Sequence, residues 1–138
     1  MIAEIVAIGT ELLMGQIVNT DAQYLSRRLQ SLGISVYYHT TVGDNPRRMR
    51  DTLAQALSRS DIVITTGGLG PTQDDLSKEM AAELLNLPML FDEESWRAIE
   101  GYFARLGRIC PPNNKKQAIL TGRVWMQGSH LGDDPRKH

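Results

Sequence analysis

Apolar residues in the first half of the chain alternate between the pattern of a buried strand and the pattern of an amphipathic helix. Short runs rich in β-branched residues cover 2–8, 34–42 and 62–64, and a glycine follows each run within three residues. Apolar residues recur at helical spacing in 21–32 and 46–57. Alternating strands and crossover helices predict right-handed crossovers and a mostly parallel sheet, so the predicted fold class is α/β. The run at 62–64 is predicted to be buried on both faces.

Each of the two predicted helices has an apolar stripe. The stripe residues are Ala22, Leu25, Leu29 and Leu32 in the first helix, and Met49, Leu53, Ala56 and Leu57 in the second. Further helices are predicted at 76–87 and 93–106. The segment 111–116 opens with two prolines, which suits either a structured loop that brings Asn113, Asn114 and Lys115 to a ligand or a linker. Beyond it, one strand is predicted at 123–126 and disorder from 128 onward.

Composition limits the classes of protein to consider. The chain has 138 residues, 41% of them hydrophobic, which suits one domain with a real core. Its 15 basic and 16 acidic residues give a net charge of -1, which argues against nucleic-acid partners and anionic membranes. The sequence shows no signal peptide and no membrane-spanning apolar run, so we expect a cytoplasmic protein. The single cysteine, Cys110, is expected to be a bystander thiol.

A glycine-rich stretch from Thr65 to Asp75 follows the third predicted strand. Glycines 67, 68 and 70 can adopt positive φ, and their amides can line a concavity that suits phosphate. Asp74 and Asp75 would repel a bare phosphate unless a divalent cation lies between them, so a metal-assisted phosphate site is predicted. The alternative is a tight turn in which the two acids cap the helix that they open. The stretch is neither a Walker A loop nor the dinucleotide-binding fingerprint.

Polar residues also follow the first two predicted strands. Parallel strands place their carboxyl ends along one edge of the sheet, where open α/β sheets bind ligands. Thr10, Glu11, Asn19 and Asp44 are therefore candidate ligand contacts near the glycine loop. The alternatives are local, because Asn19 can cap a helix and Glu11 can be merely solvated.

These segments resemble a known family. The motifs that carry the resemblance are the run from Glu4 to Thr20, Thr41-Val42-Gly43-Asp44-Asn45, Gly67-Gly68-Leu69-Gly70-Pro71-Thr72-Gln73-Asp74-Asp75 and Asn113-Asn114-Lys115-Lys116-Gln117-Ala118. Over residues 1 to about 120 they closely resemble the amino-terminal domain of the CinA family. That domain is similar to the molybdopterin-binding domain of the MogA, MoaB and MoeA proteins. The resemblance implies a three-layer α/β/α sandwich.

The resemblance also implies an activity and roles for individual residues. For CinA proteins it implies a metal-dependent ADP-ribose pyrophosphatase, and for the wider group it implies binding of a pterin phosphate or nucleotide. The implied catalytic and metal-binding residues are Asp75, Asp44 and Asp74, with magnesium, manganese or cobalt as the metal. The expected ligand contacts are Thr66, Gly67, Gly68, Gly70, Thr72, Thr10, Glu11, Asn19, Asn114 and Lys115.

The end of the chain departs from the family pattern that the resemblance leads us to expect. We expect residues 1–120 to form a domain without its last elements, and 121–138 to form a divergent, disordered tail. No amidase domain is expected. Two functions stay open: hydrolysis of a nucleotide diphosphate-sugar, or binding of molybdopterin or nucleotide without catalysis by a remnant that self-associates. A homo-oligomer is expected, with no nucleic-acid or membrane partner.

Overall fold

The computed structural model describes residues 1–121, which fall into two compact units. The first unit is Met1–Gly68 and the second begins at Leu69. No helix in the described part of the chain has the length and apolarity needed to cross a bilayer.

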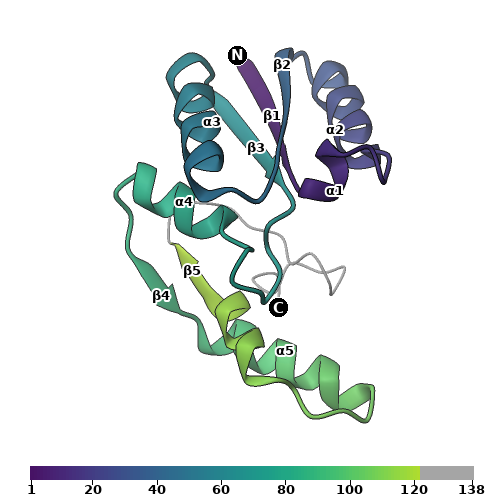
Figure 1. Cartoon of the computed structure of the whole chain (residues 1–138), viewed down its shortest axis with the longest axis vertical. Helices are drawn as coiled ribbons and strands as arrows, with labels where there is room; N and C mark the ends of the chain where they lie inside the picture. The colour runs from purple at the N-terminus through teal and green to yellow at the C-terminus, as the bar shows by residue number, and fades with distance from the viewer. Residues whose placement is uncertain (122–138) are drawn as a thin grey trace. The chain divides into compact units, whose positions relative to one another are not determined.

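The first unit is built on a three-stranded parallel sheet with the order β2-β1-β3 (Figure 1). Its strands are β1 (Ile2–Ile8), β2 (Ser35–Val42) and β3 (Ile62–Thr66), and its helices are α1 (Thr10–Leu13), α2 (Thr20–Ser31) and α3 (Pro46–Arg59). The predicted α/β fold class and parallel sheet are confirmed. The strand at 2–8 is predicted to the residue because it is a continuous apolar run that ends at glycine.

The two long helices cover opposite faces of the sheet (Figure 1). Ala3 and Ile5 of β1 form a buried cluster with Ala22 and Leu29 of α2. Successive residues of a strand point to opposite faces, so Glu4 points to the other face, where it pairs with Arg59 of α3. The first unit therefore has three layers, with β1 buried between two helices.

Several predictions for this unit need correction. The run Ile62–Ile64 is only half-buried, because β3 lies at an edge of the described sheet, whereas the central strand β1 is buried on both sides. Leu32 and Leu57 lie near the ends of their helices and are exposed rather than part of the core. The predicted loop at 9–20 contains the short helix α1.

The second unit combines helices with a two-stranded antiparallel sheet (Figure 1). Its elements are α4 (Ser77–Leu84), β4 (Met89–Phe91), α5 (Glu93–Arg105), the 3-10 helix η1 (Pro112–Ala118) and β5 (Ile119–Thr121). Helix α5 matches its prediction, and the side chain of Asp92 caps it by accepting from the amide of Ser95 at 2.9 Å. Strands β4 and β5 were not predicted.

Three boundaries in the second unit differ from the predictions. Helix α4 begins at Ser77, with Leu76 as its N-cap, so Asp74 and Asp75 precede the helix and do not cap it. The same helix ends at Leu84 rather than Leu87, because the chain turns at Asn86, which has φ 52°. The segment that begins at Pro112 is a 3-10 helix rather than a loop or linker.

The strand predicted at 123–126 and the tail predicted after it lie outside the described residues. Cys110 is a free thiol, and its pKa is raised by burial and by the nearby carboxylate of Glu100.

Candidate functional site

The carboxyl ends of the three parallel strands meet at one edge of the first unit, as predicted. Thr10 follows β1 and Asp44 follows β2, and a hydrogen bond of 3.1 Å joins the Thr10 hydroxyl to Asp44 Oδ2. The amide of Asp44 donates back to the same hydroxyl at 3.2 Å. This reciprocal pair fixes the Asp44 carboxylate at the edge of the sheet.

A glycine turn closes this edge after β3. Gly67 and Gly68 have φ of 84° and 68°, a conformation that side chains disfavour. A Cβ on Gly67 would lie 2.1 Å from the carbonyl oxygen of Ile8, so only glycine allows β3 to end against the end of β1. Thr66 is the last residue of β3 and pairs with Ala7. Within the predicted phosphate loop, the backbone at Gly67 therefore lies in close contact with the backbone at Ile8, at the edge of the sheet.

Glu11 and Asn19 have local structural explanations. A Cβ on Gly9 would lie 2.6 Å from Glu11 Oε1, so the exposed Glu11 carboxylate lies close above this glycine. Asn19 Oδ1 accepts from the amide of Ala22 at 3.2 Å and caps α2. The capping role is observed, and contact of either side chain with a ligand stays a prediction.

Asp75 is held by its own loop in the second unit. Asp75 Oδ2 accepts from the amide of Thr72 at 3.0 Å and from its hydroxyl at 2.6 Å. A Cβ on Gly70 would lie 2.6 Å from the same oxygen, so the carboxylate folds back over Gly70. Asp74 is exposed. Gly70, Thr72 and Asp75, all predicted as site residues, therefore do lie together.

The surroundings of Asp75 favour the charged carboxylate. Partial burial raises the pKa of Asp75. Hydrogen bonds from Thr72 and Gly70 and the positive charge of Lys116 lower this pKa by more than burial raises it, so the net shift is downward. Asp75 is therefore an anion throughout the neutral range. An anion held by hydrogen bonds on one side is a suitable ligand for a hard cation.

Lys116 reaches the Asp75 loop, whereas the predicted residue Lys115 does not. The Lys116 ammonium donates to the backbone carbonyls of Thr72 and Asp75. The Lys115 ammonium lies 5.6 Å from the ring centroid of Phe91 and 5.9 Å from that of Trp96. Two adjacent lysines look alike in a sequence, and only the register of η1 determines which one faces the loop.

Asn114 and Lys78 hold the 3-10 helix in place. Asn114 is buried and its amide donates to Gln117 Oε1 at 2.8 Å, so its observed role is structural. The buried ammonium of Lys78 donates to the carbonyls of Lys116 at 2.7 Å and Ile119 at 3.0 Å. Burial lowers the pKa of Lys78, and repulsion from Lys116 adds to this against the opposing attraction of Glu79.

The carboxylates in the described residues suit a metal ion that takes its remaining ligands from a bound substrate. Residues 1–121 contain no group of three His, Cys, Asp or Glu side chains that could enclose a metal ion. Magnesium is commonly bound by one or two carboxylates together with substrate phosphates. Asp44 in the first unit and, separately, Asp75 in the second unit each fit that use by their chemistry, rather than the use of an all-protein cage.

The fold and the sheet edge define an α/β domain of the molybdopterin-binding class. A family model described as "Probable molybdopterin binding domain" matches residues 4–134. The chain therefore belongs to this family and, within it, to the CinA-like competence-damage inducible proteins, as the sequence motifs indicate.

Curated relatives are similar over nearly the whole chain. A "CinA-like protein" of Dictyoglomus turgidum is 58% identical over 120 residues, which cover 87% of this chain and 29% of the relative. A "Putative competence-damage inducible protein" of Acetivibrio thermocellus is 57% identical over 135 residues, or 98% of this chain and 33% of the relative. The Bacillus subtilis protein of the same description is 47% identical over 133 residues, which are 96% of this chain and 32% of the relative. The chain thus spans about one third of the length of these relatives.

Solved structures support the same fold. The crystal structure of CinA from Thermoplasma acidophilum, described as a protein with unknown function, has a TM-score of 0.80 at 28% identity. It covers 96% of this chain, and the match covers 78% of that chain. The molybdopterin biosynthesis enzyme MoaB from Thermus thermophilus has a TM-score of 0.59 at 18% identity, with 87% of this chain and 78% of that chain covered. The similarity to MoaB shows the fold alone.

Proposed function

We propose that this chain binds a nucleotide diphosphate-sugar such as ADP-ribose and hydrolyses its diphosphate with the help of a divalent metal ion. The observation that supports the proposal best is the edge of the first sheet. There the side-chain-free turn at Gly67 ends against β1, and the Thr10–Asp44 pair holds a carboxylate at the ends of β1 and β2. Backbone that a ligand can approach closely, beside a fixed carboxylate, suits a phosphate that arrives with a cation.

The proposal gives each group a defined task. The backbone of Thr66, Gly67 and Gly68 would bind and orient phosphate oxygens. Asp44 would accept the proton of the water that attacks one phosphorus, while the other phosphate leaves, giving AMP and ribose phosphate. Asp75 and Asp74 belong to the second unit, and the role of metal ligand that the family resemblance implies for them stays a prediction. A bound magnesium, manganese or cobalt ion would supply charge neutralisation and a more acidic water.

A pyrophosphatase assay tests this proposal directly. AMP release from ADP-ribose is measured with each of the three metals for the unmodified chain and for Asp44→Asn, Asp75→Asn and Asp51→Asn. Loss of a general base costs roughly 100-fold or more, so Asp44→Asn should lose nearly all turnover. Asp51 is an exposed acid of α3 and serves as the matched control, whose variant should retain full activity. Absence of metal-dependent AMP release from folded protein would refute the hydrolase proposal.

A second candidate function is binding of a pterin phosphate without hydrolysis. The family description as a molybdopterin binding domain favours it. Thermal unfolding with ADP-ribose and with a pterin phosphate, each with and without metal, separates the candidates, because a ligand of the native state raises the melting temperature whether or not it is hydrolysed. Stabilisation by the pterin alone, without AMP release from ADP-ribose, would establish the binding function.

A further inference from the structure

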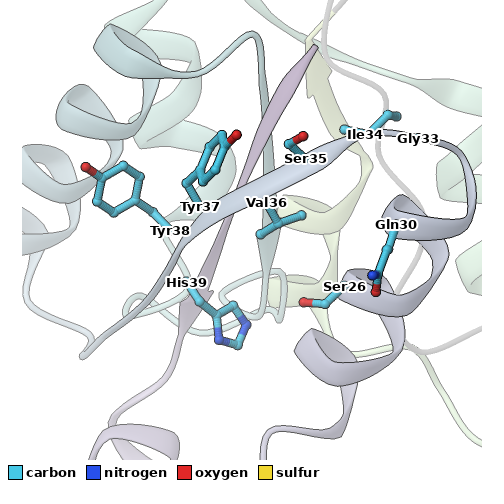
Figure 2. Close-up of a pocket in the computed structure, with 9 residues that line it drawn as sticks. All are labelled: Ser26, Gln30, Gly33, Ile34, Ser35, Val36, Tyr37, Tyr38 and His39. Carbon is cyan, nitrogen blue, oxygen red and sulfur yellow. The ribbon is translucent and has the colours of Figure 1, made fainter.

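The outer edge of β2 is open in the described residues. β2 pairs with β1 on one side, and no other described strand pairs with it. A groove of about 620 Å³ follows this edge between β2 and α2 (Figure 2). Val36 and His39 of β2 project toward Ser26 and Gln30 of α2, while Tyr37 and Tyr38 project from the opposite side of the strand.

Apart from one bulge near its start, this edge lacks the features by which proteins usually protect an edge strand. Edge strands are commonly short or carry lysine, proline or inward-pointing charges that prevent pairing with another chain. β2 has eight residues, Ser35–Val42, with no lysine, arginine, acid or proline among them. It carries instead two tyrosines, Tyr37 at 69% and Tyr38 at 47% exposure. Long, uncharged and partly aromatic, the strand is suited to pairing.

One irregularity limits where pairing can occur. The register with β1 shifts between Ala3 and Glu4, which leaves Tyr37 as an extra residue on β2. A bulge bends its strand and interrupts a ladder at that point. After it, Tyr38 to Val42 run in unbroken register with Glu4 to Ile8, so this half of β2 gives five residues of regular template.

We propose that β2 pairs antiparallel with the β2 strand of a second copy of this chain, so that the sheet continues across a twofold axis. A strand without formal charges meets no like charge when it pairs with itself. Within residues 1–121, Arg59 stacks over the ring of Tyr38, and its charge is already neutralised by Glu4. Twofold contacts in which the same surface meets itself are the commonest way in which identical chains associate.

The twofold symmetry predicts which residues meet. The two copies of the strand run antiparallel, and residues that face each other in an antiparallel pair point to the same side of the sheet. The twofold axis must therefore pass beside a residue that faces its own copy. We place His39 at the axis, since it is exposed, lies near the middle of β2 and belongs to the regular half. Tyr38 then faces Thr40 of the second copy.

Charge substitutions at His39 test the pairing. Sedimentation velocity over a concentration series should give a dimer for the unmodified chain. His39→Lys and His39→Glu should each raise the dissociation constant by on the order of fivefold, because like charges then face each other across the axis. An equimolar mixture of the two variants should recover a dimer, because opposite charges face each other in the mixed pair.

Matched controls separate strand pairing from a general effect of charge. Gln55→Lys and Gln55→Glu introduce the same charges at an exposed position of α3 and should leave the dissociation constant unchanged. Far-ultraviolet circular dichroism verifies that all variants fold. Hydrogen exchange should show that backbone amides in 38–42 become slower to exchange as the protein concentration rises.

Three outcomes would overturn the proposal. One is a chain that remains monomeric at the highest accessible concentration, which would leave the edge to another protein or to no partner. Another is a dimer that the His39 variants do not weaken. The third is a mixture of the Lys and Glu variants that associates no better than either variant alone. None of these results depends on whether the chain hydrolyses ADP-ribose.

Discussion

At the scale of single residues, Asp75 shows how a carboxylate can be kept charged without an ion pair to a side chain. Two donors of Thr72 and the backbone of Gly70 act on the carboxylate, and Lys116 contributes its charge from a position where it binds carbonyls. The sequence predicted that Asp75 matters through a helix-opening pair of acids. The structure shows that it closes a turn that ends before the helix begins.

The lowered pKa of Asp75 gives a pH prediction with a definite sign. A carboxyl group whose pKa is lower in the folded than in the unfolded state stabilises the fold above its unfolded pKa and loses that contribution as the pH falls. The unmodified chain should therefore be more stable than Asp75→Asn at pH 7, by about 1 kcal/mol, the net scale of a hydrogen bond. The difference should shrink as the pH falls below about 4. Urea unfolding at pH 7 and pH 3 measures it, and a difference that grows in acid would contradict it.

Gly67 gives a prediction about backbone geometry. Gly67→Ala must place a Cβ at positive φ and also 2.1 Å from the Ile8 carbonyl oxygen, so the end of β3 has to move. The matched control is Gly15→Ala, which has φ 72° and no heavy atom within 4 Å of the new Cβ. Gly15→Ala should cost only the backbone strain, about 1 kcal/mol, and Gly67→Ala clearly more. Equal losses in urea unfolding would show that the close approach to β1 is not needed for stability.

At the scale of elements, Lys78 and Lys116 link parts of the second unit that are far apart in the sequence. Lys78 of α4 binds carbonyls of η1 and β5, and Lys116 of η1 binds carbonyls of the Asp75 loop. Neither contact follows from a sequence pattern, because a lysine on an amphipathic helix is normally solvated. The short strands β4 and β5 escape prediction for a related reason: three residues are too few to show an alternation, and the strands form only by pairing with each other.

Removing the Lys78 ammonium should loosen η1 and β5. Lys78→Met keeps the apolar stem but leaves the two carbonyls without this donor, at a cost of about 1–3 kcal/mol for an unsatisfied buried group. Because burial lowers the pKa of Lys78, its charge is penalised in the fold, and the unmodified chain should gain stability over Lys78→Met as the pH rises toward 10.5. Urea unfolding at pH 7 and 10 tests both statements. The control is Lys115→Met, which changes an exposed lysine of η1 and should lower the free energy of unfolding by less.

The elements that were predicted correctly are those whose own sequence determines them. β1, α2 and α3 have long apolar patterns with glycine, asparagine or proline at their ends, and each forms close to its predicted range. The strand-end site follows from the same pattern, because a parallel sheet brings Thr10, Asp44 and Gly67 to one edge. The remaining site features, such as the choice of Lys116 over Lys115, depend on tertiary contacts and could not be predicted.

At the scale of the whole molecule, association through β2 would couple stability to protein concentration. Anything that binds the folded chain in preference to the unfolded chain raises the melting temperature, and a second copy acts as such a ligand. The first sheet of the described chain has β1 covered on both faces but β2 open along its outer edge, so pairing would add hydrogen bonds along an edge that no described strand pairs with. A chain that does not associate would have the same melting temperature at every protein concentration.

The melting temperature should therefore rise with concentration in the unmodified chain. Scanning calorimetry from micromolar to millimolar protein should show a steady increase, since a hundredfold excess of ligand over its dissociation constant adds about 2.7 kcal/mol of stability. His39→Lys should reduce this slope, and the Gln55→Lys control should keep it. An equal slope in both variants would mean that association uses a different surface. A flat curve for the unmodified chain would mean that folding of the first unit is complete without a partner.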